Sequence, residues 1–549
     1  MTSRREFIKC ASGVAALSAI SGRAAAQIIP SFSTGRHGFR AGAGPFSNPN
    51  VSGPQNLKYI GYFTLPSAFA YGGGCLAMGP ATGTLYASGN SLATGNGLGC
   101  VNIPADANLN GTVATFYSGV NGGAFQGQIQ DYINTNTTQN PGSTRPLPTS
   151  AMLVGSTLFM SYVWQYPGTR NQTLNYVKID SNLAQSSLVI DFQLGTTVDA
   201  ANYAVWGNIA PEWQSTFQAD SIATNGMPSI NGAISFGEQA WFFNSSNLGS
   251  TSAVAASEGA FFPYNGGAGP GVGGMATTMW STPGLAFSSI PATNQYYSQT
   301  DHVMACFMPA GFRDLVYITK HGAGIPAYGQ PTATYSLNGT QESAGPPPVA
   351  YFYNSVGTGG KGDVNYPSTL SIVCYDVHDL INVKNGTVAS NSITPRLAAE
   401  IPPPPFMTQG IVNAAYTSLD GGGCYDPATG RIYLNVAQDG SGNPLIAVYQ
   451  FQSADSTELE CTDGYILPAA TMGSAYSHQL TITGGTGPYT VTVSTQLNMA
   501  SNSGGTWLTV SSSGLITGTP TAQEWDLLMI TITDSASHTI KRSMMLEAA

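Results

Sequence analysis

The chain has 549 residues, which is too long for one ordinary domain and predicts two or three. Charged residues make up only 8% of it, against about a quarter in a typical soluble protein, while glycine occurs 66 times. That composition favours many short strands joined by tight turns over surface helices held by ion pairs. The formal charge is −10 and no basic stretch is present, which argues against nucleic acid as a partner.

The N-terminus predicts export. Residues 1–26 contain the pair Arg4-Arg5, a modest apolar stretch at 10–20 and three alanines at 24–26. This pattern resembles a twin-arginine signal peptide cleaved before Gln27, with an amphipathic first helix as the alternative. The resemblance implies an extracytoplasmic protein: periplasmic, cell-surface or secreted. The apolar stretch is too short to span a bilayer, so no transmembrane segment is expected after signal removal.

The cysteine and histidine content predicts no cofactor. Removing the signal leaves six cysteines, at positions 75, 100, 306, 374, 424 and 461, and an oxidising compartment permits disulfides among them. Their spacing does not match a metal site, and only six histidines occur in the whole chain. Which metal binds, if any, stays unknown. A structural calcium is left open, because calcium can bind through backbone carbonyls that leave no sequence signature.

A strand–turn–strand unit recurs along the chain. YGGGCLAMGPATGTLYASGN begins at Tyr71 and returns almost unchanged as LDGGGCYDPATGRIYLNVAQ from Leu419. Weaker relatives begin at Ser150, Asn231 and Asp301, each with two short apolar strands around a turn. Five units predict a five-bladed β-propeller. A sixth blade near 186–206, or a disconnected array of β-sandwiches, is the alternative.

The expected all-β propeller covers residues 55–455, after a linker at 27–54. The isolated strand Leu57–Leu65 is expected to complete the last blade beside Leu445–Phe451, which would leave no unprotected ring edge. The first and last units would then be neighbours in the ring.

After a second linker at 456–465, residues 466–549 differ in character. They resemble the immunoglobulin-like (cadherin-like) modules appended to bacterial surface and secreted enzymes. The matching pieces are Tyr476-Ser477, Gly484-Gly485-Thr486-Gly487-Pro488-Tyr489, Gly514-Leu515-Ile516-Thr517-Gly518-Thr519-Pro520 and Thr533-Asp534. The resemblance implies a small β-sandwich spacer and carries over no catalytic residue.

The propeller resembles a family of uncharacterised secreted bacterial β-propeller proteins. The shared elements are Tyr71-Gly72-Gly73, Pro211-Glu212-Trp213-Gln214, His321-Gly322-x-Gly324 and Tyr425-Asp426-Pro427-Ala428-Thr429-Gly430-Arg431. This resemblance supports the fold and implies no particular chemistry.

No Gly-x-Ser-x-Gly, P-loop or His-Glu-x-x-His motif is present, so candidate residues follow from propeller geometry. Loops that enter each innermost strand, and loops that join the second and third strands, share the face around the central channel. The carboxylates expected there are Asp301, Asp420, Asp131 and Asp220, as catalytic candidates. The substrate-binding candidates are His302, His321, Lys320, Arg170, Trp164, Tyr166 and Glu212.

Paired carboxylates are what glycosidic cleavage needs, with one acting as acid and the other as base or nucleophile. The sequence therefore predicts a glycoside hydrolase whose partner is a polysaccharide or cell-surface glycan; the oligomeric state is unknown. A non-catalytic glycan-binding or surface-assembly propeller is the main alternative. A polysaccharide lyase or a cofactor-dependent oxidoreductase is a weaker one. Asp420 can also be read as a turn residue that caps its own backbone.

Overall fold

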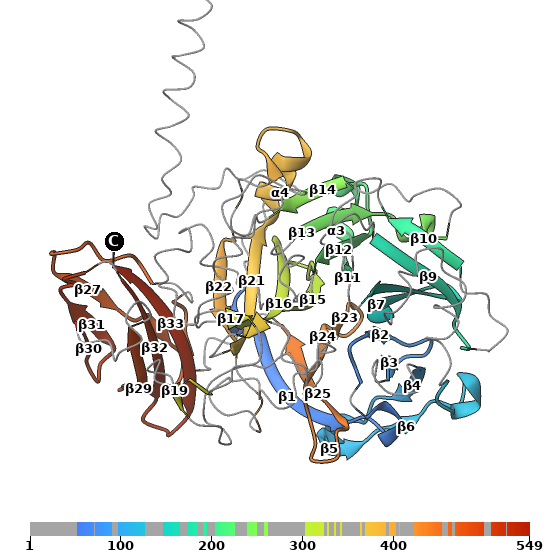
Figure 1. Cartoon of the computed structure of the whole chain (residues 1–549), viewed down its shortest axis with the longest axis horizontal. Coiled ribbons are helices and arrows are strands. Elements are labelled where there is room, and N and C mark those ends of the chain that lie inside the picture. The colour runs from blue at the N-terminus through green and yellow to red at the C-terminus, as the bar shows by residue number, and fades with distance from the viewer. Residues whose placement is uncertain are drawn as a thin grey trace, which may run out of the picture. The chain divides into compact units, whose positions relative to one another are not determined.

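The computed structural model describes the chain in segments. They are residues 52–70, 72–89, 97–126, 146–164, 174–183, 190–194, 204–225, 239–249, 257–261, 302–322, 327–328, 334–335, 341–342, 363–364, 368–390, 393, 395–401, 404, 406, 422–452, 459–463, 467–498, 507–522 and 524–548. These segments are predominantly β, with two α-helices: α3 at Pro211–Phe217 and α4 at Val377–Lys384 (Figure 1). Within them, no helix has the length and apolarity that crossing a membrane requires.

The repeated unit is a β-hairpin in both copies. The second copy pairs β23 (Gly423–Asp426) with β24 (Arg431–Gln438) around the Pro-Ala-Thr-Gly turn. Asp426 organises that turn, because its carboxylate accepts hydrogen bonds from the Ala428 N–H at 3.0 Å and the Thr429 hydroxyl at 2.6 Å. Gly430 ends it with φ 72°, a left-handed conformation in which glycine has no Cβ penalty. The Asp426 role is therefore structural.

Five sheets contain most of the strands that precede residue 452, and their pairings are antiparallel except for that of β1 with β5 (Figure 1). The first is β2 (Leu76–Met78), β3 (Thr84–Ser88), β4 (Leu98–Asn102) and β6 (Thr115–Phe116). The second is β7 (Pro146–Val154), β8 (Thr157–Trp164), β9 (Leu174–Asp180) and β10 (Ile190–Leu194). The third is β11 (Ala204–Asn208), β12 (Ser221–Asn225), β13 (Gln239–Phe243) and β14 (Ser257–Phe261). The fourth is β15 (His302–Phe307), β16 (Asp314–Gly322), β21 (Ser368–Asp376) and β22 (Leu397–Glu400).

The fifth sheet joins the two ends of this region. Its order is β23, β24, β25 (Pro444–Phe451), β1 (Leu57–Thr64) and β5 (Asn110–Val113). β1 pairs antiparallel with β25, from Leu57 opposite Phe451 to Thr64 opposite Leu445. The expectation that the N-terminal strand completes the last sheet is confirmed.

The third sheet differs from the expected one. Of the strand–turn–strand unit expected from Asn231, the described residues include only β13. The other two strands paired with it in order, β11 and β12, lie earlier in the chain. β11 is short and contains Trp206 and Gly207, so its apolar pattern is too brief to stand out. Residues 190–194 and 204–208, near the position considered for a sixth blade, belong to the second and third sheets.

Apolar residues fill the spaces between neighbouring sheets. Side chains of β15, β16 and β21 pack with those of β23, β24 and β25. Phe307 of β15 and Tyr425 of β23 stack with ring centroids 4.1 Å apart. α3 and α4 add Trp213 and Leu380 to the core between the third and fourth sheets. Two further strand pairs are short: β17 (Ala327–Tyr328) with β20 (Asp363–Val364), and β18 (Thr334–Tyr335) with β19 (Gln341–Glu342).

The C-terminal strands form separate small sheets around their own core. One is β27 (Tyr476–Gln479), β31 (Leu515–Gly518) and β30 (Leu508–Val510), and the other is β29 (Thr490–Asn498), β32 (Glu524–Thr533) and β33 (Thr539–Ala548). β26 (Glu460–Cys461) pairs with β28 (Ile482–Thr483). The stretch expected as a linker therefore contains a strand, and Glu460 forms a buried ion pair with Arg542 of β33.

Candidate functional site

The first strands of the five sheets contact one another in a cycle. β2 contacts β7, β7 contacts β11, β11 contacts β15, β15 contacts β23, and β23 returns to β2. We call these five the innermost strands, and the end at which they begin the leading end. At the opposite end, the Met308 N–H after β15 donates to the Asn208 carbonyl of β11 at 2.9 Å, so these two strands run in the same direction. β11 and β15 therefore begin at the same end of their sheets.

Glycines allow the innermost strands to approach this closely. A Cβ on Gly207 of β11 would lie 1.8 Å from the Cys306 carbonyl oxygen of β15. A Cβ on Gly422 would lie 2.3 Å from the Gly74 carbonyl oxygen, and the Gly422 N–H donates to the Gly73 carbonyl at 3.1 Å. The described parts of the two Gly-Gly-Gly-Cys copies therefore lie side by side, and Gly422 of the second copy leaves room for the backbone of the first.

The leading end of the fourth sheet contains His302 and Lys320. His302 begins β15 and lies opposite Lys320 in the β15–β16 register. Its side chain is buried, with the residue 6% exposed. Burial, with the nearby Lys320 charge adding to it, lowers the pKa of His302 to about 3. The imidazole is therefore neutral at neutral pH and can accept or donate one hydrogen bond.

Asn435 lies at the leading end of the fifth sheet. Its Nδ2 donates to the Gly72 carbonyl at 3.0 Å, and its backbone N–H donates to the Gly422 carbonyl at 2.8 Å. Its buried Oδ1 has no hydrogen-bond partner among the residues that the structure describes. An amide oxygen at this position is a potential acceptor for a hydroxyl donor. No sequence signal points to Asn435, because one Asn among many carries no pattern.

The other residues predicted for this end are only partly described. Asp301, Asp420, Asp131, Arg170 and Tyr166 lie outside the described residues. For Trp164 and His321 the backbone is described: Trp164 ends β8, and His321 pairs with Thr369 near the end of β16. Both strand positions are at the leading end of their sheets.

Asp220 and Glu212 are not at the leading end. They were expected before the third innermost strand, but the innermost strand is β11, so their segment follows it and lies at the opposite end. The Asp220 carboxylate accepts from the Ser221 hydroxyl at 2.8 Å and from the Ser245 N–H and hydroxyl at 2.7 and 2.8 Å. Glu212, in α3, accepts from the Gly311 N–H at 2.6 Å. These bonds fix turns at the end of the third and fourth sheets that lies opposite the leading end, which we call the trailing end.

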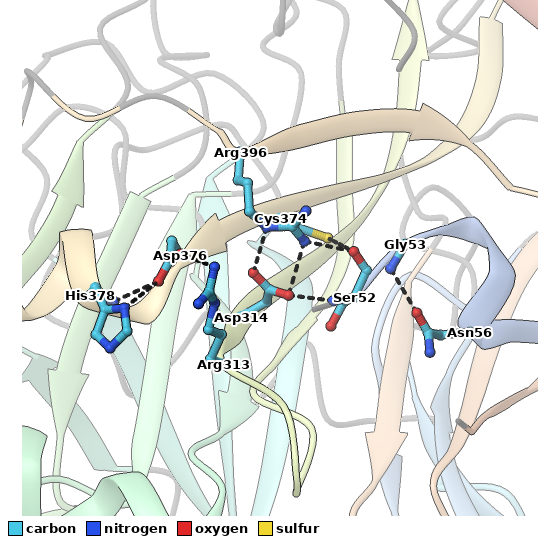
Figure 2. Close-up of polar contacts among 9 residues, drawn as sticks. All are labelled: Ser52, Gly53, Asn56, Arg313, Asp314, Cys374, Asp376, His378 and Arg396. Atoms are coloured by element: carbon cyan, nitrogen blue, oxygen red, sulfur yellow. Dashed lines mark hydrogen bonds and ion pairs between the residues drawn. The ribbon is translucent and has the colours of Figure 1, made fainter. Parts of the chain in front are cut away.

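A cluster of charged residues lies at the same trailing end of the fourth sheet (Figure 2). Arg396 donates twice to Asp314, at 3.0 Å each, and Arg313 pairs with Asp376 at 3.1 Å. Asp376 also caps α4, accepting from the His378 N–H at 2.9 Å. The sequence signal for this cluster is the concentration of charges at 313–314 and 376–379 in a chain of low charge. None of these residues was among the predicted site residues.

Neither a metal centre nor a reactive thiol follows from the described residues. They contain no group of three or more His, Cys, Asp or Glu placed to hold a metal ion. The six cysteines named above are all buried and unpaired. Burial raises the pKa of Cys75, Cys306 and Cys374, so these thiols stay protonated and act as small apolar groups.

No protein-family model matches the sequence, and no curated protein does. Solved structures do resemble the chain. An exo-1,5-alpha-L-arabinanase from a bovine ruminal metagenomic library is 8% identical over 69% of this chain and 93% of its own, with a TM-score of 0.32. A glycoside hydrolase family 43 protein, YxiA from Bacillus licheniformis, is 10% identical over 89% of this chain and 97% of its own, with a TM-score of 0.30.

A candidate alpha-galactosidase from Bacteroides fragilis is 11% identical over 18% of this chain, with a TM-score of 0.15. This chain spans only 19% of that protein's length. All three TM-scores are below 0.5, so these likenesses identify no activity for this chain.

Proposed function

We propose that the chain is an exported carbohydrate-active enzyme, a glycoside hydrolase that acts on a polysaccharide. The observation that carries the proposal is the cycle of contacts among the innermost strands. We interpret the five sheets as the blades of a five-bladed β-propeller, with the leading end as the channel mouth. Ligands usually bind where such loops converge around a channel.

The proposed chemistry uses two carboxylates from the segments that enter the innermost strands. These segments contain Asp131 before β7, Asp301 before β15 and Asp420 before β23. One carboxyl group protonates the glycosidic oxygen, and the other is the nucleophile or activates water, at a separation of about 5 to 10 Å. Asp220 is left out, because its carboxylate is bonded at the opposite end. Neutral His302, adjacent to Asp301, is a hydrogen-bond partner for that carboxyl or for a sugar hydroxyl.

We further propose that residues 1–26 direct export through the twin-arginine route and are then removed. The C-terminal sheets are proposed to be an immunoglobulin-like sandwich that acts as a spacer or as a glycan contact. Their separate core of Leu528, Ile530 and Leu546 supports an independent module. Charged residues make up only 8% of the chain, which suits a partner that is recognised by hydrogen bonds and ring stacking.

The test is to incubate the mature protein with a panel of polysaccharides and measure released reducing ends. With a substrate found, Asp301→Asn is expected to abolish turnover and leave the melting temperature nearly unchanged. Asp220→Asn is the matched control, since the same substitution at the trailing end should keep turnover. Normal cleavage by Asp301→Asn would show that this carboxyl is not catalytic.

A non-catalytic glycan-binding propeller is the second candidate. One observation favours it: Asp220 and Glu212, two of the acids predicted for the mouth, are used in structural hydrogen bonds elsewhere. Tight binding of a glycan without any release of reducing ends, and with Asp301→Asn binding unchanged, would establish this alternative.

A further inference from the structure

The segment before β1 connects two different sheets. β1 belongs to the fifth sheet, but Ser52, five residues earlier, contacts β16 and β21 of the fourth. The Ser52 N–H donates to the Asp314 carboxylate, and the Ser52 carbonyl accepts from Arg396 at 2.6 Å (Figure 2). The Cys374 thiol also points at this carbonyl, at 3.8 Å. Ser52 is thus held through its backbone by three residues more than 260 positions away.

The other end of this segment is fixed to the fifth sheet. The Asn56 side chain donates to the Gln452 carbonyl at 2.9 Å, and the Gln452 N–H donates to the Asn56 carbonyl at 3.0 Å. Asn56 also accepts the Gly53 N–H through its Oδ1 at 2.9 Å, which braces the turn between the two anchors. Five residues therefore span from the fifth sheet to the fourth.

The anchor on the fourth sheet is a buried charge. Asp314 is fully buried, and its charged form is stable there only with donors on both oxygens. Burial raises the pKa of Asp314, and the adjacent Arg396 charge opposes that rise. The Ser52 N–H supplies one of the donors, and the Ser52 carbonyl satisfies the guanidinium in turn. Arg396 donates to both Asp314 oxygens, and the segment adds a second donor to Oδ2 and an acceptor for the guanidinium.

We propose that residues 52–56 form a clasp that locks the seam between the fourth and fifth sheets. The apolar part of the seam, which includes Leu57, Ile318 and Tyr449, packs the two sheets through contacts that are not directional. The clasp adds directional bonds that only one alignment satisfies. β1 pairs with β25 in the fifth sheet, and the clasp then bonds this strand's N-terminal side to the fourth sheet. Without these bonds, we expect the fourth and fifth sheets to separate at the seam more often.

The innermost strands on the two sides of the seam are also the ones that two candidate carboxylates precede in the chain. β15 and β23 are the innermost strands on its two sides, and Asp301 and Asp420 lie just before them in the chain. The clasp itself is independent of the proposed hydrolase activity. It is therefore tested by exchange of backbone amides and not by turnover.

The deciding variant is Ser52→Pro, which removes the N–H donor and keeps the carbonyl. Ser52→Ala is the matched control, because the buried Ser52 hydroxyl has no hydrogen-bond partner among the described residues. We expect hydrogen exchange in β1 and β16 to be about tenfold faster or more in Ser52→Pro, because a hydrogen bond to a buried charge is lost. Ser52→Ala should match the wild type, and β8 and β9 of the second sheet should be unchanged in both.

Unchanged exchange in β1 and β16 would overturn the proposal, as would equal acceleration in β8 and β9, which indicates general destabilisation. A second pair of variants covers failure of Ser52→Pro to fold. Asn56→Ala should accelerate exchange in the same seam strands, whereas Gln452→Ala should not, because Gln452 contacts Asn56 through its backbone. Identical exchange in these two variants would likewise reject the clasp.

Discussion

Asp314 and Asp376 lie directly opposite each other in the β16–β21 register, and each is paired with a different arginine. Two carboxylates at opposed positions of neighbouring strands repel each other. Arg396 offsets the charge of Asp314, and Arg313 offsets that of Asp376. Burial tends to lower the pKa of Arg396, but the Asp314 charge outweighs it and the pKa is raised, so Arg396 stays charged.

This arrangement predicts unequal costs for removing the two carboxylates. Asp314→Ala removes a carboxylate with no exposed surface and deprives both the Arg396 guanidinium and the Ser52 N–H of their acceptor, so it should lower the free energy of unfolding by about 3 to 5 kcal/mol. Asp376→Ala removes a helix cap and a pair whose carboxylate is 16% exposed, and should cost about 1 to 2 kcal/mol. Urea unfolding measures both. Asp106→Ala, at a pair whose carboxylate is 65% exposed, is the control and should cost less than about 1 kcal/mol. Equal losses in all three variants would contradict the ranking.

The contact between innermost strands predicts a strict requirement for glycine. Gly207→Ala places a Cβ against the Cys306 carbonyl, so the backbone must move. We expect this to lower the free energy of unfolding by about 2 kcal/mol or more. Gly440→Ala is the control, since nothing lies within 4 Å of the Cβ it would add. Thermal melting compares the two. A Gly207→Ala protein as stable as Gly440→Ala would show that β11 and β15 do not approach this closely.

His302 predicts a loss of stability in acid. Its folded-state pKa is about 3, below the unfolded value of 6.5, so below pH 6.5 the unfolded chain binds more protons. Its contribution is fully present above pH 6.5 and decreases towards pH 3, by up to about 1.4 kcal/mol per pH unit. His302→Gln should remove this slope between pH 6.5 and 4.5. His538→Gln, at a side chain that is 72% exposed, should retain it. Parallel pH profiles for wild type and His302→Gln would refute the assignment.

Asp534 predicts a second acid transition in the C-terminal strands. Desolvation raises its pKa, but hydrogen bonds from His538 and the Thr486 N–H outweigh it and lower the pKa to about 2. A depressed carboxyl pKa stabilises the fold above the unfolded value, and the effect is lost as pH falls from about 4 to 2. Asp534→Asn should abolish this dependence of stability on pH, which circular dichroism measures as unfolding at each pH. Ser535→Ala removes a neutral bond to Thr486 and should shift stability equally at every pH.

Local pattern was enough to predict much of this fold. The Pro-Ala-Thr-Gly turn and the hairpin around it follow from alternating apolar residues and turn residues, which act over a few positions. The pairing of the N-terminal strand with Leu445–Phe451 is predicted by a different argument, that a ring of sheets leaves no unprotected edge. Sequence alone failed at β11, whose short run with Trp206 and Gly207 is defined by strands on either side of it. That error moved Asp220 and Glu212 to the wrong end of the third sheet.

What the sequence by itself determined is the β-rich class, the repeat and the strand that joins the two ends of the five-sheet region. Only the tertiary structure decided which charges meet. Ser52, Asp314 and Arg396 are distant in the chain, and no periodicity relates them. The physical reason is that strand patterns are set by neighbours in sequence. The desolvation cost of a buried charge, in contrast, is offset by hydrogen-bond donors that folding brings from anywhere in the chain.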